Sequence, residues 1–297
     1  MITYSKYCKL IIDKPSWRTN KVKLKNILAL ETELNTQLDR YKCDIEVFLY
    51  KSIEELTQEV SGVRDHALLI AATDTTIALG KELGVASMAY ANPEIPHQTY
   101  SGVNMLVEGF EEVDVDFLEK VYQRYHHIPW TILETKRCVV RELTLEDLDD
   151  LFVLYRDEEI CRYTDALHAY EEEKELQRAY IENMYRYFGY GLWLVFSKDT
   201  GALIGRAGLE HREYHDEIEL DLGYVIGTNY QRQGFATEVC EAIIEYAKEN
   251  TGFERINVMI KDENLASKKL AQKLGFLHVE DLETEKGCFC RYAINFF

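Results

Sequence analysis

Apolar and polar positions repeat with two different periods in the second half of the chain. Thr144 precedes the first repeat and Asp147 stands three positions later, an arrangement typical of a helix N-terminus. The apolar positions of this repeat lie one, three or four residues apart, which predicts one buried helix face. They are Leu145, Leu148, Leu151, Phe152 and Tyr155.

Acidic and apolar residues alternate from 217 to 222 within the segment "DEIELDLGYVI", residues 216–226. Successive side chains of a strand point to opposite faces, so this segment predicts a strand with one apolar and one acidic face. The apolar members are Ile218, Leu220 and Leu222, and the acidic members are Glu217, Glu219 and Asp221.

The same patterns, read from residue 136 onward, give one strand, two helices, three strands, and then helices and strands in turn. The expected elements are strand 136–143, helices 145–155 and 171–188, a hairpin over 191–214 turning at Asp199-Thr200-Gly201, strand 216–226, helix 236–250, strand 255–261, helix 264–276 and a final strand from residue 288.

The first 128 residues carry a separate pattern. Residues 66–94 predict a strand, a helix and a strand, with Asp74-Thr75-Thr76 capping the helix. A short strand and a closing helix at 116–125 follow. Pro129 lies in a segment where the organisation changes, so we expect a domain at 1–128, a linker at 129–135 and a second domain at 136–297.

The length of 297 residues also suggests two domains. The net charge of −18 argues against nucleic acid or an anionic membrane as partner and favours a cationic one. Residues 134–297 carry −13 of this charge. The N-terminus lacks the apolar core of a signal peptide and no long apolar run follows, so we expect a cytoplasmic protein with no membrane partner.

The cysteines give no sign of a disulfide framework or a zinc site, because no two of them form a Cys-x-x-Cys pair. Cys288 and Cys290 alternate along the final strand, which puts both thiols on one face. We therefore expect core packing and no metal site. The seven cysteines are Cys8, Cys43, Cys138, Cys161, Cys240, Cys288 and Cys290.

The segment "NYQRQGFATE", residues 229–238, places Gly234 just before a predicted helix. A helix N-terminus presents unpaired N–H groups and can bind phosphate, and glycine lets the anion approach the backbone. A plain strand-to-helix turn explains the glycine equally well.

Further residues favour the phosphate interpretation. Gln231-x-x-Gly234-x-Ala236 resembles the pyrophosphate-binding signature of the GNAT superfamily of acetyl-CoA-dependent N-acetyltransferases, Gln/Arg-x-x-Gly-x-Gly/Ala. Asn264-Leu265-Ala266-Ser267 and Leu274-Gly275-Phe276 resemble its second coenzyme motif. "LGYVI" and "LTLEDLDDLF" look like the branch containing ribosomal-protein-alanine N-acetyltransferases. The resemblance covers 136–297 and implies a mixed α+β fold with a splayed central sheet.

The resemblance also implies a coenzyme site for acetyl-CoA. Backbone groups of the splayed strand would bind the pantetheine arm, amides at the helix start would bind the pyrophosphate, and Asn264 would hold the arm or simply cap its helix. The carried-over positions are Tyr224, Val225, Ile226, Gln231, Arg232, Gln233, Gly234, Phe235, Ala236, Thr237, Asn264 and Ser267.

Catalysis needs a base for the amine and a proton donor for the departing thiolate. Many superfamily members carry a tyrosine donor where this chain has Ala271, so Ser267 becomes the candidate donor, or is an ordinary helix-start serine. For the base, Asp221 matches a position that is often glutamate in relatives. Glu219 and Glu217 share its face, and a solvated acidic edge is the alternative. The pair Glu210 and His211 lies near the expected acceptor cleft.

The acidic surface suits a primary amine, and protein N-termini, polyamines, aminoglycosides and metabolite amines all remain open. "YEEEKE" at 170–175 lies on the expected acceptor wall, or is a solvated helix face. An N-acetyltransferase by direct transfer is favoured. The alternative is a regulatory protein whose fold binds the coenzyme without efficient chemistry, to which Ala271 points. A homodimer is left open.

The N-terminal pattern resembles the latter half of haloacid-dehalogenase-like phosphatases, an α/β fold of Rossmann type. The resemblance would make Asp74 a magnesium ligand, but the family's nucleophile pattern is missing, because "LIIDKPSW" supplies only Asp13. One carboxylate makes a poor magnesium site. We therefore expect a truncated, non-catalytic domain, with a phosphatase as the third and weakest function.

Overall fold

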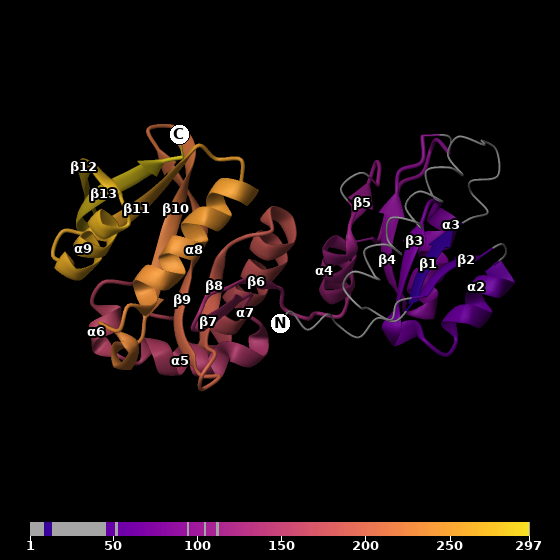
Figure 1. Ribbon diagram of the computed structural model, residues 1–297, viewed down its shortest axis with the longest axis horizontal. Coiled ribbons are helices and arrows are strands. Elements are labelled where there is room, and N and C mark those ends of the chain that lie inside the picture. The colour runs from indigo at the N-terminus through magenta and orange to yellow at the C-terminus, as the bar shows by residue number, and fades with distance from the viewer. Residues whose placement is uncertain are drawn as a thin grey trace. The chain divides into compact units, whose positions relative to one another are not determined.

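The computed structural model describes residues 9–13, 46–50, 53–93, 95–103, 105–110 and 113–296. The chain divides into two compact units, Met1–Trp130 and Thr131–Phe297, each built on its own sheet (Figure 1). Cys8, Cys43 and the residues that follow Asp13 in the expected nucleophile region lie outside the described residues.

The N-terminal unit is an α/β structure. Its elements are β1 (Lys9–Asp13), β2 (Glu46–Tyr50), α2 (Ile53–Val60), η2 (Arg64–His66), β3 (Ala67–Ala71), α3 (Asp74–Leu83), β4 (Ala86–Tyr90), β5 (Leu106–Val107) and α4 (Val115–Tyr125). The strands are parallel in the order β2-β1-β3-β4-β5. Leu68 and Leu69 of β3 belong to apolar clusters on opposite faces, so the whole strand is buried, as parallel strands usually are.

Helix α3 begins earlier than its sequence suggests. Thr73 is the N-cap residue, and its hydroxyl accepts the N–H of Thr76 at 3.2 Å. Asp74 is the first helical residue, and its carboxylate instead accepts the backbone N–H groups of Thr99 and Tyr100 at 2.7–3.1 Å. The expected cap at Asp74 is therefore wrong, because the hydroxyl one position earlier reaches the helix start.

The C-terminal unit is a mixed α+β structure. Its elements are β6 (Thr131–Glu134), β7 (Cys138–Arg141), η3 (Leu145–Asp147), α5 (Leu148–Tyr155), α6 (Glu158–Cys161), α7 (Tyr170–Tyr180), the π-helix η4 (Ile181–Phe188), β8 (Leu192–Ser197), β9 (Leu203–Tyr214), β10 (Glu217–Ile226), η5 (Thr228–Tyr230), α8 (Phe235–Asn250), β11 (Arg255–Lys261), α9 (Leu265–Lys273), β12 (Leu277–Thr284) and β13 (Gly287–Asn295). The sheet order is β12-β13-β11-β10-β9-β8-β7-β6.

The centre of this sheet splits between β10 and β11. Strand β10 pairs with β9 along its whole length, from Glu217 to Ile226. With β11 it pairs only at Leu220 and Asp221, after which the two parallel strands part. Helix α8 packs across β9 and β10 and is drawn in front of the sheet in Figure 1. The split leaves backbone groups of β10 without strand partners on the β11 side, beside the start of α8.

Several elements differ from the sequence expectation, among them β6, the helix at 171–188 and β12. Strand β6 falls inside the segment 129–135 that was expected to be a linker, because it pairs with β7. The expected helix 171–188 changes from α7 to the wider η4, which puts Tyr185 in the core with its hydroxyl donating to the Leu192 carbonyl. Strand β12 was not assigned. Within the described ranges, every helix is too short or too polar to traverse a lipid bilayer.

Candidate coenzyme and acceptor site

A cavity of about 720 Å³ opens where β10 and β11 part. Its size lies within the range of ordinary ligand sites. Most of the coenzyme positions expected from the sequence line it, although they come from three separate stretches of chain. They are Tyr224, Val225, Ile226, Gln231, Arg232, Gly234, Ala236, Thr237, Asn264 and Ser267.

The loop before α8 turns sharply, which aims the helix start into this cavity. Arg232 has φ 58° and Gly234 has φ 84°, both in the left-handed region. A glycine adopts this conformation without strain, so Gly234 satisfies a backbone demand as well as giving room. The first helical hydrogen bond runs from the Glu238 N–H to the Gly234 carbonyl. The amides of Ala236 and Thr237 therefore have no acceptor within the helix and remain available to an anion.

Two of the expected loop residues direct their side chains away from the cavity. The Gln233 amide donates to the carbonyl of Asn229 at 2.8 Å, and the Phe235 ring is 8% exposed and packs in the core. Neither residue lines the cavity. Gln231 lines it but donates its side-chain N–H to the Ile226 carbonyl at 2.9 Å. These side chains therefore shape the loop, and any contact of Gln233 or Phe235 with a ligand would be through the backbone.

Arg137 supports the same loop and was not expected from the sequence. Its guanidinium donates to the Gln233 carbonyl at 2.9 Å, pairs with Glu238 at 2.7 Å and stacks on the Phe235 ring. It comes from the turn before β7, about a hundred residues upstream, so no local pattern links it to the loop. Its second terminal nitrogen lies 3.5 Å from where a side-chain carbon on Gly234 would be.

The start of α9 forms the opposite wall. Asn264 is the N-cap residue, and its side-chain oxygen accepts the Ser267 N–H at 3.1 Å. The Tyr224 hydroxyl donates to the Ser267 carbonyl at 3.4 Å, which joins β10 to α9. Burial raises the pKa of Tyr224, so its phenol keeps the proton at neutral pH. Ala271, at the usual tyrosine position, is 1% exposed and packs in the core.

The acidic face of β10 is less uniform than its sequence suggests. Asp221 is 6% exposed, and its carboxylate accepts from Arg212 at 2.9 Å and from the Tyr214 hydroxyl at 2.7 Å. A solvated edge is therefore wrong for Asp221, because its carboxylate is buried. Burial raises its pKa, and these two donors oppose that rise. Glu219 accepts from Asn257 at 2.7 Å, and its carboxylate is also within 4 Å of arginine nitrogens. Only Glu217 is exposed.

Glu210 faces Asp221 across the β9–β10 pair. Burial raises the pKa of Glu210, the nearby Asp221 raises it further, and Arg206 opposes both. The only hydrogen bond found for its carboxylate among the described residues is a long one from the Tyr180 hydroxyl, at 3.5 Å. Glu210 is thus a partly buried carboxyl with a raised pKa and a weak donor, the combination that suits a general base.

His211, the other member of that pair, lies on the opposite face of β9. Its Nε2 is 2.6 Å from the Tyr190 hydroxyl, and Phe188 packs edge-on against its ring. Burial lowers the pKa of His211, so it is neutral at pH 7. These contacts explain the histidine structurally. In the segment 170–175, Glu173 is also structural, because it is 3% exposed and accepts from Gln177 at 2.6 Å.

Asp74 is not free to bind magnesium in this arrangement. Both of its carboxylate oxygens accept N–H groups from the 98–100 segment, which lowers the pKa of Asp74 chiefly through Thr99. The resemblance of the N-terminal unit to haloacid-dehalogenase-like phosphatases finds no support in the comparisons with known proteins.

These comparisons concern the C-terminal unit. Residues 137–277 match the model of the acetyltransferase (GNAT) domain family. Among curated proteins, the uncharacterized N-acetyltransferase YoaA of Bacillus subtilis is 29% identical over 147 residues, which cover 49% of this chain and 82% of YoaA. The uncharacterized N-acetyltransferase p20 of Bacillus licheniformis is 27% identical over 52% of this chain and 89% of its own length.

Solved structures show a similar coverage. A spermidine N-acetyltransferase from Vibrio cholerae, in complex with CoA and spermine, aligns with 53% of this chain and 95% of its own, at 20% identity and a TM-score of 0.46. The family match and the curated relatives carry the assignment. Residues 137–277 are a GNAT acetyltransferase domain, and the C-terminal unit of this chain is an N-acetyltransferase.

Proposed function

We propose that the C-terminal unit transfers an acetyl group from acetyl-CoA directly to a primary amine. The observation that carries this proposal is the cavity of about 720 Å³ between the parted strands, with the open amides of α8 on its wall. A long, narrow ligand with a diphosphate fits this combination, because its arm can pair with strand backbone while the diphosphate binds the helix start.

In this proposal the pantetheine arm lies along Tyr224–Ile226 and the pyrophosphate lies on the amides from Gln233 to Thr237. Arg232 lines the cavity and supplies positive charge at that end. Arg137 acts on the loop rather than on the ligand, since its guanidinium is held by Glu238 and the Gln233 carbonyl. Asn264 and Ser267 hold the arm from the α9 side.

Two proton transfers accompany the reaction. The neutral amine attacks the thioester carbonyl carbon, the tetrahedral intermediate collapses, and the C–S bond breaks to release CoA. We assign the proton of the amine to the facing carboxyls Glu210 and Asp221, with Glu210 as acceptor because Asp221 is already held by two donors. The departing sulfur takes its proton from Tyr224 or Ser267, which adjoin each other at the cavity wall.

The acceptor remains a class of molecule: a protein N-terminus, a polyamine or a small-molecule amine. The charge of −13 on residues 134–297 supports an acceptor that arrives as a cation. The proposal also takes the protein as cytoplasmic and residues 1–128 as a non-catalytic α/β domain. It leaves a homodimer open.

A thiol-release assay tests the activity. The full chain is mixed with acetyl-CoA and one amine at a time: a peptide, spermidine, an aminoglycoside or a small amine. The mass of each product is determined by mass spectrometry. We expect thiol release that depends on the amine, with one acetyl group added to it. Initial rates should give intersecting rather than parallel lines, because direct transfer forms no acetyl-enzyme. Tight acetyl-CoA binding with no amine-dependent release would support the regulatory alternative instead.

A further inference from the structure

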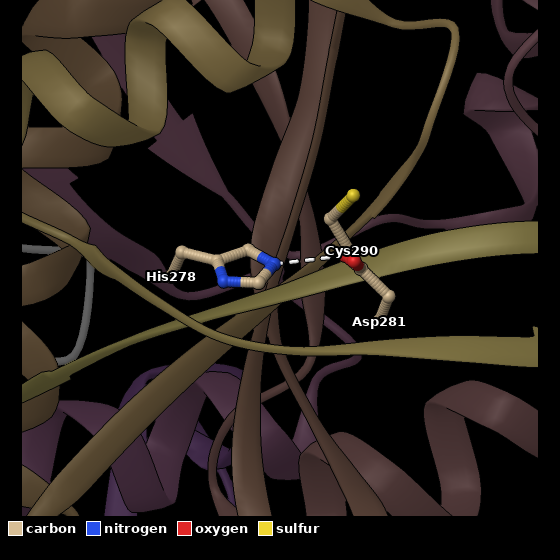
Figure 2. A group of neighbouring side chains, drawn as sticks. All are labelled: His278, Asp281 and Cys290. Carbon is tan, nitrogen blue, oxygen red and sulfur yellow. Dashed lines mark hydrogen bonds and ion pairs between the residues drawn. The ribbon is translucent and has the colours of Figure 1, made fainter.

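Three different metal-ligand side chains meet at the surface of the β12–β13 hairpin. They are His278, Asp281 and Cys290, and their ligand atoms all lie within 4.8 Å of one another (Figure 2). The His278 Nε2 atom is 2.8 Å from an oxygen of Asp281. The side chains of His278 and Asp281 are 47% and 72% exposed, whereas Cys290 is buried, so the sulfur lies beneath an accessible imidazole and carboxylate.

A β-bulge brings these side chains together. Residues three apart in a regular strand point to opposite faces, so His278 and Asp281 would be separated by the sheet. The pairing with β13 shifts by one residue at Val279, so His278 lies opposite Tyr292 and Asp281 opposite Cys290. Both therefore share the face of Cys290. Bulges are over-represented at sites where a side chain has to be re-aimed.

Neighbouring groups fix the cluster and offer a fourth ligand. The Tyr292 ring packs edge-on against the His278 ring, with centroids 5.3 Å apart, which orients the imidazole. Asp262, just after β11, has a carboxylate oxygen 3.4 Å from the Cys290 sulfur. Lys268 lies 2.5 Å from the same oxygen. An internal cation thus already lies beside the thiol and the carboxylates.

We propose that His278, Asp281 and Cys290 bind a zinc ion, with Asp262 or a water in the fourth position. Thiolate, imidazole and carboxylate are the ligand types that zinc takes, and a sulfur ligand disfavours magnesium and calcium. When the metal binds, the Cys290 thiol loses its proton to solvent and a Zn–S bond forms. The His278–Asp281 hydrogen bond is replaced by bonds to the metal.

With Asp262 in the fourth position, the ion would join two segments: the β12–β13 hairpin and the loop that leads from β11 to α9. Asn264 and Ser267 of that region line the coenzyme cavity. A bound zinc would therefore steady the α9 wall of the cavity without touching the coenzyme. The site does not depend on the acetyltransferase reaction, and its test does not use activity.

Cobalt(II) serves as the spectroscopic probe. The full chain is stripped with a chelator, dialysed and titrated with Co²⁺, then back-titrated with Zn²⁺. We expect one Co²⁺ per chain, with a sulfur-to-cobalt charge-transfer band that Zn²⁺ removes. Cys290→Ser should abolish the band, and His278→Ala should weaken Co²⁺ binding at least about tenfold, the scale of losing a ligand or its support.

Cys288→Ser is the matched control, because Cys288 alternates with Cys290 on the same strand yet is exposed and outside the cluster. It should keep both the band and the affinity. Asp281→Asn, at an exposed side chain, covers the case in which Cys290→Ser fails to fold, and should weaken binding similarly. Absence of stoichiometric binding to the wild type, or a band that persists in folded Cys290→Ser, would overturn the proposal.

Discussion

Glu210 and Asp221 face each other across two strands, yet their surroundings differ. Burial raises the pKa of both carboxyls, but Asp221 has two strong donors that oppose the rise, whereas Glu210 has one long hydrogen bond. A base works in its deprotonated form, so kcat/KM should rise with pH through the raised pKa of Glu210. Glu210→Gln should remove this rise and lower kcat/KM about 100- to 1,000-fold, within the usual range for general-base catalysis.

The pH profile of kcat/KM for the two variants, Glu210→Gln and Asp221→Asn, distinguishes their roles. Asp221→Asn should retain the rise with pH while lowering the melting temperature, because Arg212 loses a buried partner. A profile in which only Asp221→Asn loses the rise would assign the base to Asp221.

The proton donor can be tested in the same way. The phenol of Tyr224 is protonated at neutral pH, burial raises its pKa further, and its hydroxyl lies against Ser267 at the cavity wall. Tyr224→Phe should lower kcat about 100-fold, whereas Ser267→Ala should change it little. Steady-state rates at saturating acetyl-CoA decide the matter, and the reverse pattern would make Ser267 the donor.

At the scale of single residues, the sequence was informative where chemistry is local. Gly234, Asn264 and Ser267 lie inside short motifs at helix starts, which is why the sequence could place them at one site, and all three line the same cavity. Arg137 could not be predicted, because it reaches the loop from a turn about a hundred residues away. The cluster of His278, Asp281 and Cys290 was not predicted for a related reason: the spacing from His278 to Asp281 places them together only with the bulge at Val279.

At the scale of elements, a capping box at Thr144 and Asp147 begins the 3-10 turn η3, which runs directly into α5. Asp147 accepts the Thr144 N–H and pairs with Arg141 at 2.6 Å. Burial would raise the pKa of Asp147, but Arg141 and Thr144 outweigh it and the pKa is lowered. Its stabilisation is therefore present above the ordinary pKa of about 3.9 and is lost as pH falls through the lowered value.

Asp147→Asn should reduce the free energy of unfolding by about 2 kcal/mol at pH 7, the upper end of measured cap effects. The difference from wild type should shrink in strong acid. The exposed Asp150, in the same turn, gives the control Asp150→Asn, which should change stability little. Denaturant unfolding of the three proteins at several pH values measures this, and equal losses in both variants would contradict the role of the capping box.

Regular elements could be predicted where one period runs unbroken, as in β10 and α8. The exceptions involve a change of period or a long-range pairing. The π-helix η4 continues the apolar pattern of α7, and no residue in the sequence marks the change of helix type. Strand β6 forms only because β7 pairs with it. The sequence suggested a cap at Asp74, but the N-cap of α3 is Thr73, one residue earlier. Both residue types suit an N-cap, so the sequence alone does not distinguish them.

For the whole molecule, the negative charge should attract a cationic acceptor. A polyamine carries several positive charges, so its kcat/KM should fall steeply as salt is raised from about 0.01 M to 1 M, where screening shortens from about 30 Å to 3 Å. A monoamine substrate should respond less. Initial rates with both amines across this range provide the measurement, and equal salt effects would remove the electrostatic argument for the acceptor class.

In the N-terminal unit, the hydrophobic pattern predicts the fold class but not the function. The α/β character of the N-terminal unit could be predicted, because apolar runs alternate with a helix in 66–94. The resemblance of this unit to a phosphatase is not supported, because a fold pattern does not determine which carboxylates are available to bind a metal. Asp74 is held by the 98–100 segment instead.

The central claim is that the cavity between β10 and β11 binds acetyl-CoA through the start of α8, and isothermal titration tests it most directly. Gly234→Glu places a negative side chain at φ 84° in that loop, whereas Gly201→Glu places one at φ 70° in the β8–β9 turn, with open space around it. Both substitutions carry similar backbone strain. We predict micromolar binding by wild type and Gly201→Glu. The affinity of Gly234→Glu should be at least about 100-fold lower, which at about 1.4 kcal/mol per tenfold is about 2.8 kcal/mol of binding free energy. Equal binding by all three proteins, or none by the wild type, would contradict the account.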